Sequence, residues 1–246
     1  MAQKNLSNHV SYTYQALRRG VAAIAFGLPI MLAFGGYVWK QLPLQNSMSA
    51  YYHANAGHGP MRDWFVGGLF AVGVILFVYQ GYTRREDIAL NLAGMFVCGV
   101  ALVPMEWSES TTSDKFSWHG VLAVLFFLCI GYVCVFRATD TLSLILDVQK
   151  RARYRRWYKI IGTLMWLSPL GAFLLVSVFG VRDQLIFFVE LFGVYAFAAF
   201  WALKGHEIGL TKADYKATKG ELQHQETAGQ TYIVQEALPK VELLGI

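Results

Sequence analysis

The sequence predicts an all-α integral membrane protein, a bundle of six transmembrane helices with the N-terminus and the C-terminus both in the cytoplasm. Three observations support this prediction. The chain of 246 residues is 55% hydrophobic and only 15% charged, and its mean hydropathy is +0.39. Its charges gather between long apolar runs, whereas a soluble protein spreads them over its surface. No run alternates with a period of two residues, which favours helices, whose backbone groups are satisfied within the segment.

Six apolar runs meet the length needed to cross a bilayer, which is about 20 mostly apolar residues. They cover residues 21–39, 64–82, 88–105, 118–136, 160–181 and 185–203. The first run is too long for the core of a signal peptide and has no small-x-small cleavage site after it, so we expect a retained signal anchor. The predicted domains are a cytoplasmic N-terminal segment (1–20), a six-helix transmembrane domain (21–204) and a cytoplasmic tail (205–246).

The distribution of positive charge predicts the orientation. With the N-terminus inside, 17 of the 21 Lys and Arg residues lie on cytoplasmic segments. The outer segments keep only Lys40, Arg62, Lys115 and Arg182. Cytoplasmic retention of Lys and Arg orients membrane proteins in this direction. We therefore expect a multi-pass protein of the bacterial cytoplasmic (inner) membrane.

The connections and small residues indicate which helices are neighbours. The turn over residues 83–87 is so short that the second and third runs must form an antiparallel hairpin. Small residues at Gly67, Gly73 and Gly94 allow close packing of these two helices. The longer connection over residues 137–159 is typical of a short amphipathic helix on the inner leaflet.

A basic and aromatic stretch precedes the fifth run. Its cations are Arg151, Arg153, Arg155, Arg156 and Lys159. A net charge of +5 and a pI near 9.1 are also found in nucleic-acid-binding proteins. Cations beside a membrane span, however, bind anionic inner-leaflet lipid, and the aromatic rings between them anchor the helix end at the headgroups. We therefore predict lipid headgroup contacts here and no nucleic-acid partner.

The tail is polar but not uniformly so. Its composition of Lys, Glu, Gln, Thr and Gly gives little capacity for an independent core. Residues 231–244 nevertheless carry several aliphatic side chains, which could dock on a protein partner or on the membrane domain of the same chain. Docking and disorder both stay open.

Polar side chains from four segments converge on the predicted outer face. They are Ser49, His53, His58, Arg62, Asp63, Glu106, His119 and Glu190. Glu190 lies about five residues into the sixth span, hence roughly 8 Å below the outer boundary. A bare carboxylate is costly there, so we expect Glu190 to face the bundle interior with His119, Arg62 or a bound cation as its partner.

The residue types in this cluster are those of a zinc site. His53, Asp63 and His119 are suitable zinc ligands, and Glu190 or Glu106 could act as general base towards a metal-bound water. Neither a His pair at i, i+4 spacing nor a His-Glu-x-x-His motif occurs. The same side chains could therefore form a hydrogen-bonded polar cap without a metal.

Two resemblances are visible in the segment over residues 47–67, SMSAYYHANAGHGPMRDWFVG. With the later YQGY (79–82) and NLAG (91–94), it resembles a family of bacterial six-span membrane proteins, and this resemblance implies the topology but no activity. Ser49, His53 and Asp63 also resemble the Ser-x-x-x-His and following Asp of the superfamily of alkaline ceramidases and progestin and adiponectin receptors, which implies zinc. That superfamily has seven spans and a His-x-x-x-His pair, and this sequence has neither.

Three functions stay open. The preferred one is a non-catalytic membrane component, either a subunit of a membrane assembly or a lipid-binding or sensing protein, whose tail recruits a protein partner. The alternative is a metal-dependent hydrolase of a lipid or amide at the outer leaflet. The third is a transporter or an oligomeric channel, for which Glu190 is the only acidic residue well inside a span.

Overall fold

Five helices of the computed structural model are long and apolar enough to cross a membrane. They are the continuous stretch Leu6–Lys40 and the helices Pro60–Val78, Trp118–Leu144, Val148–Val176 and Leu185–Thr211. The structure describes residues 2–54, 59–105, 117–181, 183–227 and 230–236, and 77% of the chain is helical. The fold is that of a helical membrane protein.

The remaining predicted span, the third one over residues 88–105, corresponds to α4 (Arg84–Leu102), which has 19 residues. Its first four residues, Arg84, Arg85, Glu86 and Asp87, are charged, so only residues 88–102 are apolar enough for a membrane interior. α4 is as long as Pro60–Val78 but carries more charge, so it falls short of the other five helices in composition and not in length.

The helices begin and end where the local sequence favours it. α1 (Ala2–Ile30) contains Pro29, which lacks a backbone N–H, and the next turn widens into the π-helix η1 (Met31–Gly35) before α2 (Gly36–Lys40). α3 (Pro60–Val78) begins with a proline, whose fixed φ suits a first helical turn. The Oγ1 of Thr83 caps α4 by accepting a hydrogen bond from the N–H of Glu86.

The second half of the chain contains two more long helices and a small C-terminal unit. α5 (Trp118–Tyr132) continues as the π-helix η3 (Val133–Arg137), and α6 (Val148–Ser177) begins after its N-cap Asp147. α7 (Leu185–Thr211) is followed by α8 (Ala213–Thr218) and by an antiparallel hairpin of β1 (Leu222–Thr227) and β2 (Gln230–Gln235). The predicted amphipathic helix over 137–159 is wrong, because the short 3-10 helix η4 (Leu142–Leu144) and the first turns of α6 occupy that connection.

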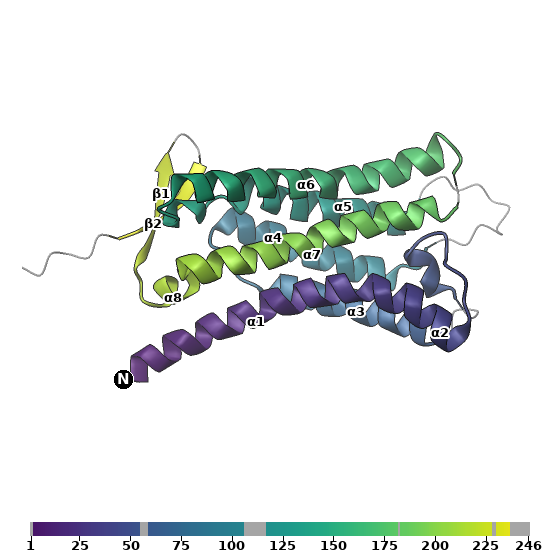
Figure 1. Cartoon of the computed structure of the whole chain (residues 1–246), viewed down its shortest axis with the longest axis horizontal. Coiled ribbons are helices and arrows are strands. Elements are labelled where there is room, and N and C mark those ends of the chain that lie inside the picture. Colours follow the sequence, from purple (N-terminus) through teal and green to yellow (C-terminus); the bar gives the residue numbers. More distant parts are fainter. Residues whose placement is uncertain (1, 55–58, 106–116, 182, 228–229, 237–246) are drawn as a thin grey trace, which may run out of the picture.

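The long helices form a closed ring, and Figure 1 shows them running lengthwise along the molecule. Going round the bundle, the order is α1, α3, α4, α5, α6 and α7, and α7 returns to α1. α3 and α4 form the predicted hairpin and touch backbone to backbone, since a Cβ atom on Gly94 would lie 2.6 Å from the carbonyl oxygen of Gly73. Large apolar side chains such as Phe77, Leu128 and Phe192 remain exposed outside the ring, as expected for a surface in contact with lipid.

The two ends of the bundle differ. We call the end that carries α8, the β-hairpin and the connections 79–87 and 137–147 the tail end. The opposite end, the loop end, holds the 3-10 helix η2 (Ser49–Tyr52) and the starts of α3, α5 and α7. In Figure 1 the tail end is on the left and α2 marks the loop end on the right.

The described part of the tail is docked on its own bundle, one of the two outcomes that the sequence left open. Ile233 of β2 is 2% exposed, and its backbone N–H donates to the carbonyl oxygen of Asp140 at 2.9 Å. The hairpin adds a small sheet to a fold predicted to be all-α. β1 (LQHQET) has one apolar residue and β2 (QTYIVQ) has three in succession, so neither shows the two-residue alternation by which a strand is recognised in a sequence.

Candidate functional site

At the loop end, η2 brings together several of the predicted outer-face residues. The Nε2 of His119 lies 2.7 Å from the Oγ of Ser49, and its Nδ1 lies 2.7 Å from the carbonyl oxygen of Val103. A carbonyl oxygen only accepts, so Nδ1 carries the proton and the neutral imidazole accepts at Nε2 from the hydroxyl of Ser49. Both ring nitrogens of His119 are therefore occupied by hydrogen bonds.

Two further residues of the cluster contact neighbouring elements. The Nε2 of His53 donates to the carbonyl oxygen of Met105 at 2.6 Å, just after α4 ends. The guanidinium of Arg62 lies over the ring of Tyr52 at 4.9 Å from its centroid, a cation–π contact. These contacts tie η2 to α3 and to the end of α4.

Glu190 is the member of the cluster that lies deepest along its helix. Its Oε2 accepts a hydrogen bond from the backbone N–H of Met48 at 2.7 Å, and the N–H of Phe187 donates to the carbonyl oxygen of Asn46 at 2.9 Å. The carboxylate therefore holds the loop before η2 against α7. Its hydrogen-bond partner is a backbone amide, where the sequence had suggested His119, Arg62 or a cation.

The predicted zinc ligands do not gather into one site. The described residues include no group of three His, Cys, Asp or Glu side chains that could hold a metal ion, so His53, Asp63 and His119 do not form one. The physical reason is that both imidazoles donate to carbonyl oxygens near the end of α4, whereas Asp63 is exposed on the first turn of α3. Glu106 and His58 lie outside the described residues.

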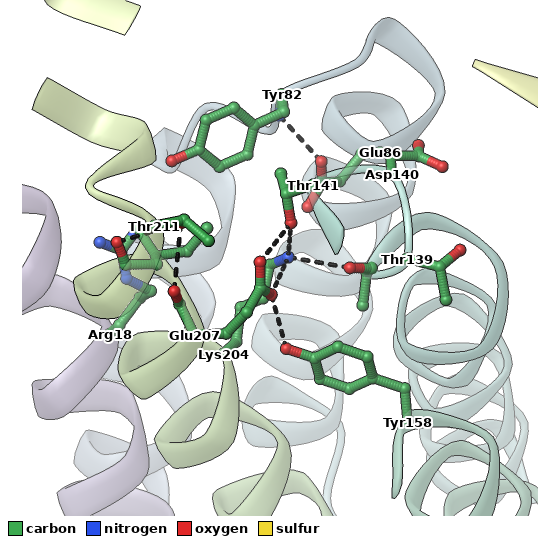
Figure 2. A network of polar contacts seen from close by, with 12 residues as sticks. Arg18, Tyr82, Glu86, Thr139, Asp140, Thr141, Tyr158, Lys204, Glu207 and Thr211 are labelled. Atoms are coloured by element: carbon green, nitrogen blue, oxygen red, sulfur yellow. Dashed lines mark hydrogen bonds and ion pairs between the residues drawn. The ribbon is translucent and has the colours of Figure 1, made fainter. Parts of the chain in front are cut away.

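At the tail end, Lys204 and Glu207 of α7 form the centre of a polar cluster that the sequence analysis missed (Figure 2). The Nζ of Lys204 donates to the carbonyl oxygen of Ala138 at 3.0 Å, to the Oγ1 of Thr141 at 2.7 Å and to the Oε2 of Glu207 at 2.8 Å. Glu207 also accepts from the hydroxyls of Thr141 and Tyr158, each at 2.7 Å. All three N–H groups of the ammonium are thus used, and Glu207 is fully buried.

A second buried ion pair joins the first helix, α1, to α8 after the last long helix. The guanidinium of Arg18 on α1 binds the carboxylate of Asp214 on α8, and it also donates to the hydroxyl of Tyr79 at 2.7 Å. The hydroxyl of Tyr82, in the connection between α3 and α4, donates to the same carboxylate. Burial and the charge of Asp214 raise the pKa of Tyr82 well above its usual value, so this phenol remains a donor at physiological pH.

A third pair and an unpaired acid complete the cluster. The Nη1 of Arg137 lies 3.4 Å from the Oδ2 of Asp140, and both side chains are buried. Glu86, at the start of α4, accepts a hydrogen bond from the backbone N–H of Tyr82 at 2.8 Å. Figure 2 places Glu86 and Asp140 beside Tyr82 at the same end of the bundle.

The β-hairpin covers this cluster. The hydroxyl of Ser143 donates to the carbonyl oxygen of Ile233, and the N–H of Ile233 donates back to Asp140. The Nε2 of His224 on β1 donates to the carbonyl oxygen of Tyr82 at 2.8 Å. The hairpin therefore bridges the α3–α4 connection and the α5–α6 connection.

The basic stretch predicted to bind lipid lies on the first turns of α6. Arg153, Arg155, Arg156 and Lys159 are exposed, whereas Arg151 is bound to the carbonyl oxygen of Ile145 through two N–H groups, at 2.7 and 3.1 Å. A shallow hollow of about 330 Å³ is lined by Ala152, Arg155, Arg156, Lys159 and Ile160. Three cations around a partly apolar floor suit an anionic headgroup with attached chains.

The sequence contains a pattern that is compatible with the tail-end cluster but does not single it out. Lys204 and Glu207 are three residues apart, which places them on one face of a helix, and Arg18 precedes the first apolar run. Arg18 and Lys204 lie at predicted span ends, where a positive charge predicts only the orientation of the chain. No spacing rule connects Arg18 with Asp214, which are 196 positions apart.

The fold and these two polar ends define the class of the protein as a helical membrane bundle whose tail end is closed by its own C-terminal segment. Comparison with known proteins adds no family to this description. No family model, no curated protein and no solved structure matches the chain.

Proposed function

We propose that this chain is a non-catalytic, six-span membrane protein that binds anionic lipid at the basic face of α6. The observation that carries the proposal is the hollow lined by Arg155, Arg156 and Lys159. Both termini lie on the cytoplasmic side in this proposal, and the protein resides in a bacterial cytoplasmic membrane.

The length of α6 supports a position of this hollow at the headgroups. α6 has 30 residues and is about 45 Å long, whereas the hydrocarbon core of a bilayer is about 30 Å thick. The helix therefore extends beyond the core by several turns. Those turns are the basic ones, because the charges of α6 precede Ile160 and uncharged residues follow it.

The exposed face of α6 changes from cationic to aromatic and then to aliphatic along the helix, which matches the headgroup and the acyl chains of a bound lipid. Arg156 and Lys159 come first, Trp157 is 49% exposed beside them, and Ile160, Leu164 and Leu167 follow on the exposed surface. Residues three and four apart share one face of a helix. A headgroup held by the cations could thus lay its acyl chains along the aliphatic side chains.

The ring of helices supports six spans. α4 packs between α3 and α5 and is antiparallel to α3, so it runs through the same layer as the five apolar helices. Its uncharged part, residues 88–102, spans only about 22 Å. Of the charged first turn, Glu86 is buried in protein, whereas Arg84 and Arg85 are exposed at the tail end, where their side chains can reach the headgroups.

Lipid retention would test the proposal. The protein is purified and reconstituted in nanodiscs of phosphatidylglycerol or of phosphatidylcholine, and the lipids that stay bound are counted by native mass spectrometry. We expect preferential retention of phosphatidylglycerol. Each cation near an anionic surface contributes about 1 kcal/mol, so the triple variant R155Q/R156Q/K159Q should weaken that retention roughly a hundredfold.

The matched control removes three other exposed cations from the tail end, in the variant R84Q/R85Q/K219Q. We expect the control to keep its preference for phosphatidylglycerol. Equal retention of the two lipids by the wild-type protein, or equal losses in the two triple variants, would refute a specific site on α6. The zinc hydrolase and transporter functions stay predictions without a supporting observation.

A further inference from the structure

Among the described residues, seven Arg, Lys, Asp and Glu side chains are buried at the tail end, and six of them form ion pairs. The pairs are Arg18 with Asp214, Arg137 with Asp140, and Lys204 with Glu207. The seventh is Glu86, which is 4% exposed. Within the described part of the chain no cation lies within ion-pair distance of its carboxyl group. The buried cluster therefore holds three cations and four carboxyl groups.

The surroundings of Glu86 leave little room for water. Its Oε2 accepts the N–H of Tyr82, and the turn at Gly81 closes over its side chain, since a Cβ atom on Gly81 would lie 2.7 Å from the Cγ of Glu86. A charged carboxylate in such a place loses its hydration without gaining a counter-ion.

The charged groups that face Glu86 do not supply that counter-ion. Lys204 and Glu207 approach from α7, and Arg137 and Asp140 approach from η3 and the connection after it. Each of the two cations is engaged with its own acid. On its own helix the charged neighbours are Arg84 and Arg85, which are exposed, and Asp87, whose carboxylate accepts the N–H of Gly81 at 3.3 Å. Burial raises the pKa of Glu86, and attraction by Lys204 and the bond from Tyr82 oppose this shift only in part.

Tyr82 connects Glu86 with the tail. Its N–H donates to Glu86, its carbonyl oxygen accepts from His224 on β1, and its hydroxyl donates to Asp214 on α8. A charge on Glu86 would draw water into the turn at Gly81 and displace Tyr82. Both tail contacts of Tyr82 would then weaken together.

We propose that Glu86 is a proton-binding site that makes docking of the tail dependent on pH: its side chain is a neutral carboxylic acid while the tail is docked, and loss of the proton loosens the tail. The direction follows from linkage. The docked state binds one proton more than the undocked state, so docking weakens as the pH rises. The proton leaves to the solvent at the tail end, where Gly81 and Tyr82 are only partly buried.

Hydrogen exchange of the tail would test the proposal in the full-length protein. The amides of β1 and β2 are followed by mass spectrometry at pH 6 and pH 9 in the wild-type protein and in Glu86→Gln, which keeps an acceptor for Tyr82 but cannot ionise. We expect equal protection at pH 6. At pH 9 the wild-type hairpin should exchange roughly tenfold faster than that of the variant, because only the wild-type side chain can lose a proton.

Glu207→Gln is the control, because it removes a carboxylate that has a counter-ion and should loosen the hairpin at both pH values. A second measurement detects the proton itself. The infrared spectra at pH 7 should differ by one C=O band of a protonated carboxylic acid, present in the wild-type protein and missing from Glu86→Gln, whereas a band from Asp140, whose pKa burial raises to about 7, occurs in both. Identical carboxylic acid bands in the two proteins, or loss of protection in Glu86→Gln at both pH values, overturns the proposal.

Discussion

Lys204 and Glu207 lie one turn apart on α7, and the 2.8 Å contact between the Nζ of Lys204 and the Oε2 of Glu207 is buried from solvent. Lys204 also donates to Ala138 and Thr141, and Glu207 also accepts from Thr141 and Tyr158, so neither charged group is left without its hydrogen bonds. Such a pair need not add net stability, but removing either partner leaves a buried charge without compensation.

Replacing one partner of this pair should therefore lower the free energy of unfolding much more than replacing both partners. We expect Glu207→Leu to lower the free energy of unfolding by about 3–5 kcal/mol, whereas the double variant Lys204→Met/Glu207→Leu should recover most of that loss. Thermal unfolding of the purified protein in one detergent measures both. A double variant less stable than the single one would show that the pair itself stabilises the bundle.

Close packing of α3 on α4 predicts a sharp difference between two glycines. A methyl group at Gly94 would lie 2.6 Å from the carbonyl oxygen of Gly73 and 2.9 Å from the backbone nitrogen of Phe77. Backbone atoms cannot move aside cheaply, so Gly94→Ala should cost about 1–3 kcal/mol or more.

The control is Gly67→Ala, because a Cβ atom at Gly67 meets nothing within 4 Å. We expect this variant to unfold within a few degrees of the wild-type protein. Equal melting temperatures for Gly67→Ala and Gly94→Ala would contradict the packing of α3 on α4 described above.

The apolar runs predicted the helices well because hydropathy acts over about 20 residues and is insensitive to detail. The close approach at Gly73 and Gly94 was likewise predictable, since small residues in adjacent spans are typical of packed membrane helices. The structure also extends α1 and α7 well beyond the predicted runs into polar sequence, where hydropathy gives no information.

The polar sites were harder to predict, because they depend on contacts between residues distant in the sequence. Ser49 and His119 did converge, as the topology suggested, and they are joined by a hydrogen bond. Among the described residues they are not part of a group of side chains that could hold a metal ion. Glu86 was indistinguishable from the other charges of a short connection. Only the three pairs around it reveal that it lacks a counter-ion.

The contact between Ser49 and His119 predicts how the loop end responds to metal. Ser49→Ala would leave the Nε2 of His119, which is 6% exposed, without a donor, at a cost of about 1–3 kcal/mol. Since that nitrogen is already bound to Ser49, we expect a chelator such as EDTA to leave the melting temperature unchanged. Stoichiometric zinc in the purified protein, together with a lower melting temperature after chelation, would support the zinc site instead.

The pair of Arg18 and Asp214 predicts that the tail can be released without unfolding the bundle. Asp214→Asn removes the charge that holds α8 to α1 and to Tyr82, and it leaves Arg18 buried, so α8 and the hairpin should detach more often. Limited proteolysis with trypsin should then cleave at Lys212, Lys216 or Lys219 at least tenfold faster than in the wild-type protein, for a loss of docking free energy of about 1.4 kcal/mol or more.

The control is the double variant Lys219→Gln/Asp214→Asn, which should still be cut at Lys212 and Lys216. It separates release of the segment from exposure of one lysine. If α8 stays as protected in Asp214→Asn as in the wild-type protein, the contacts of β2 with Asp140 and Ser143 must hold the tail on their own, and the variant Ser143→Ala/Asp214→Asn should then be the first to release it.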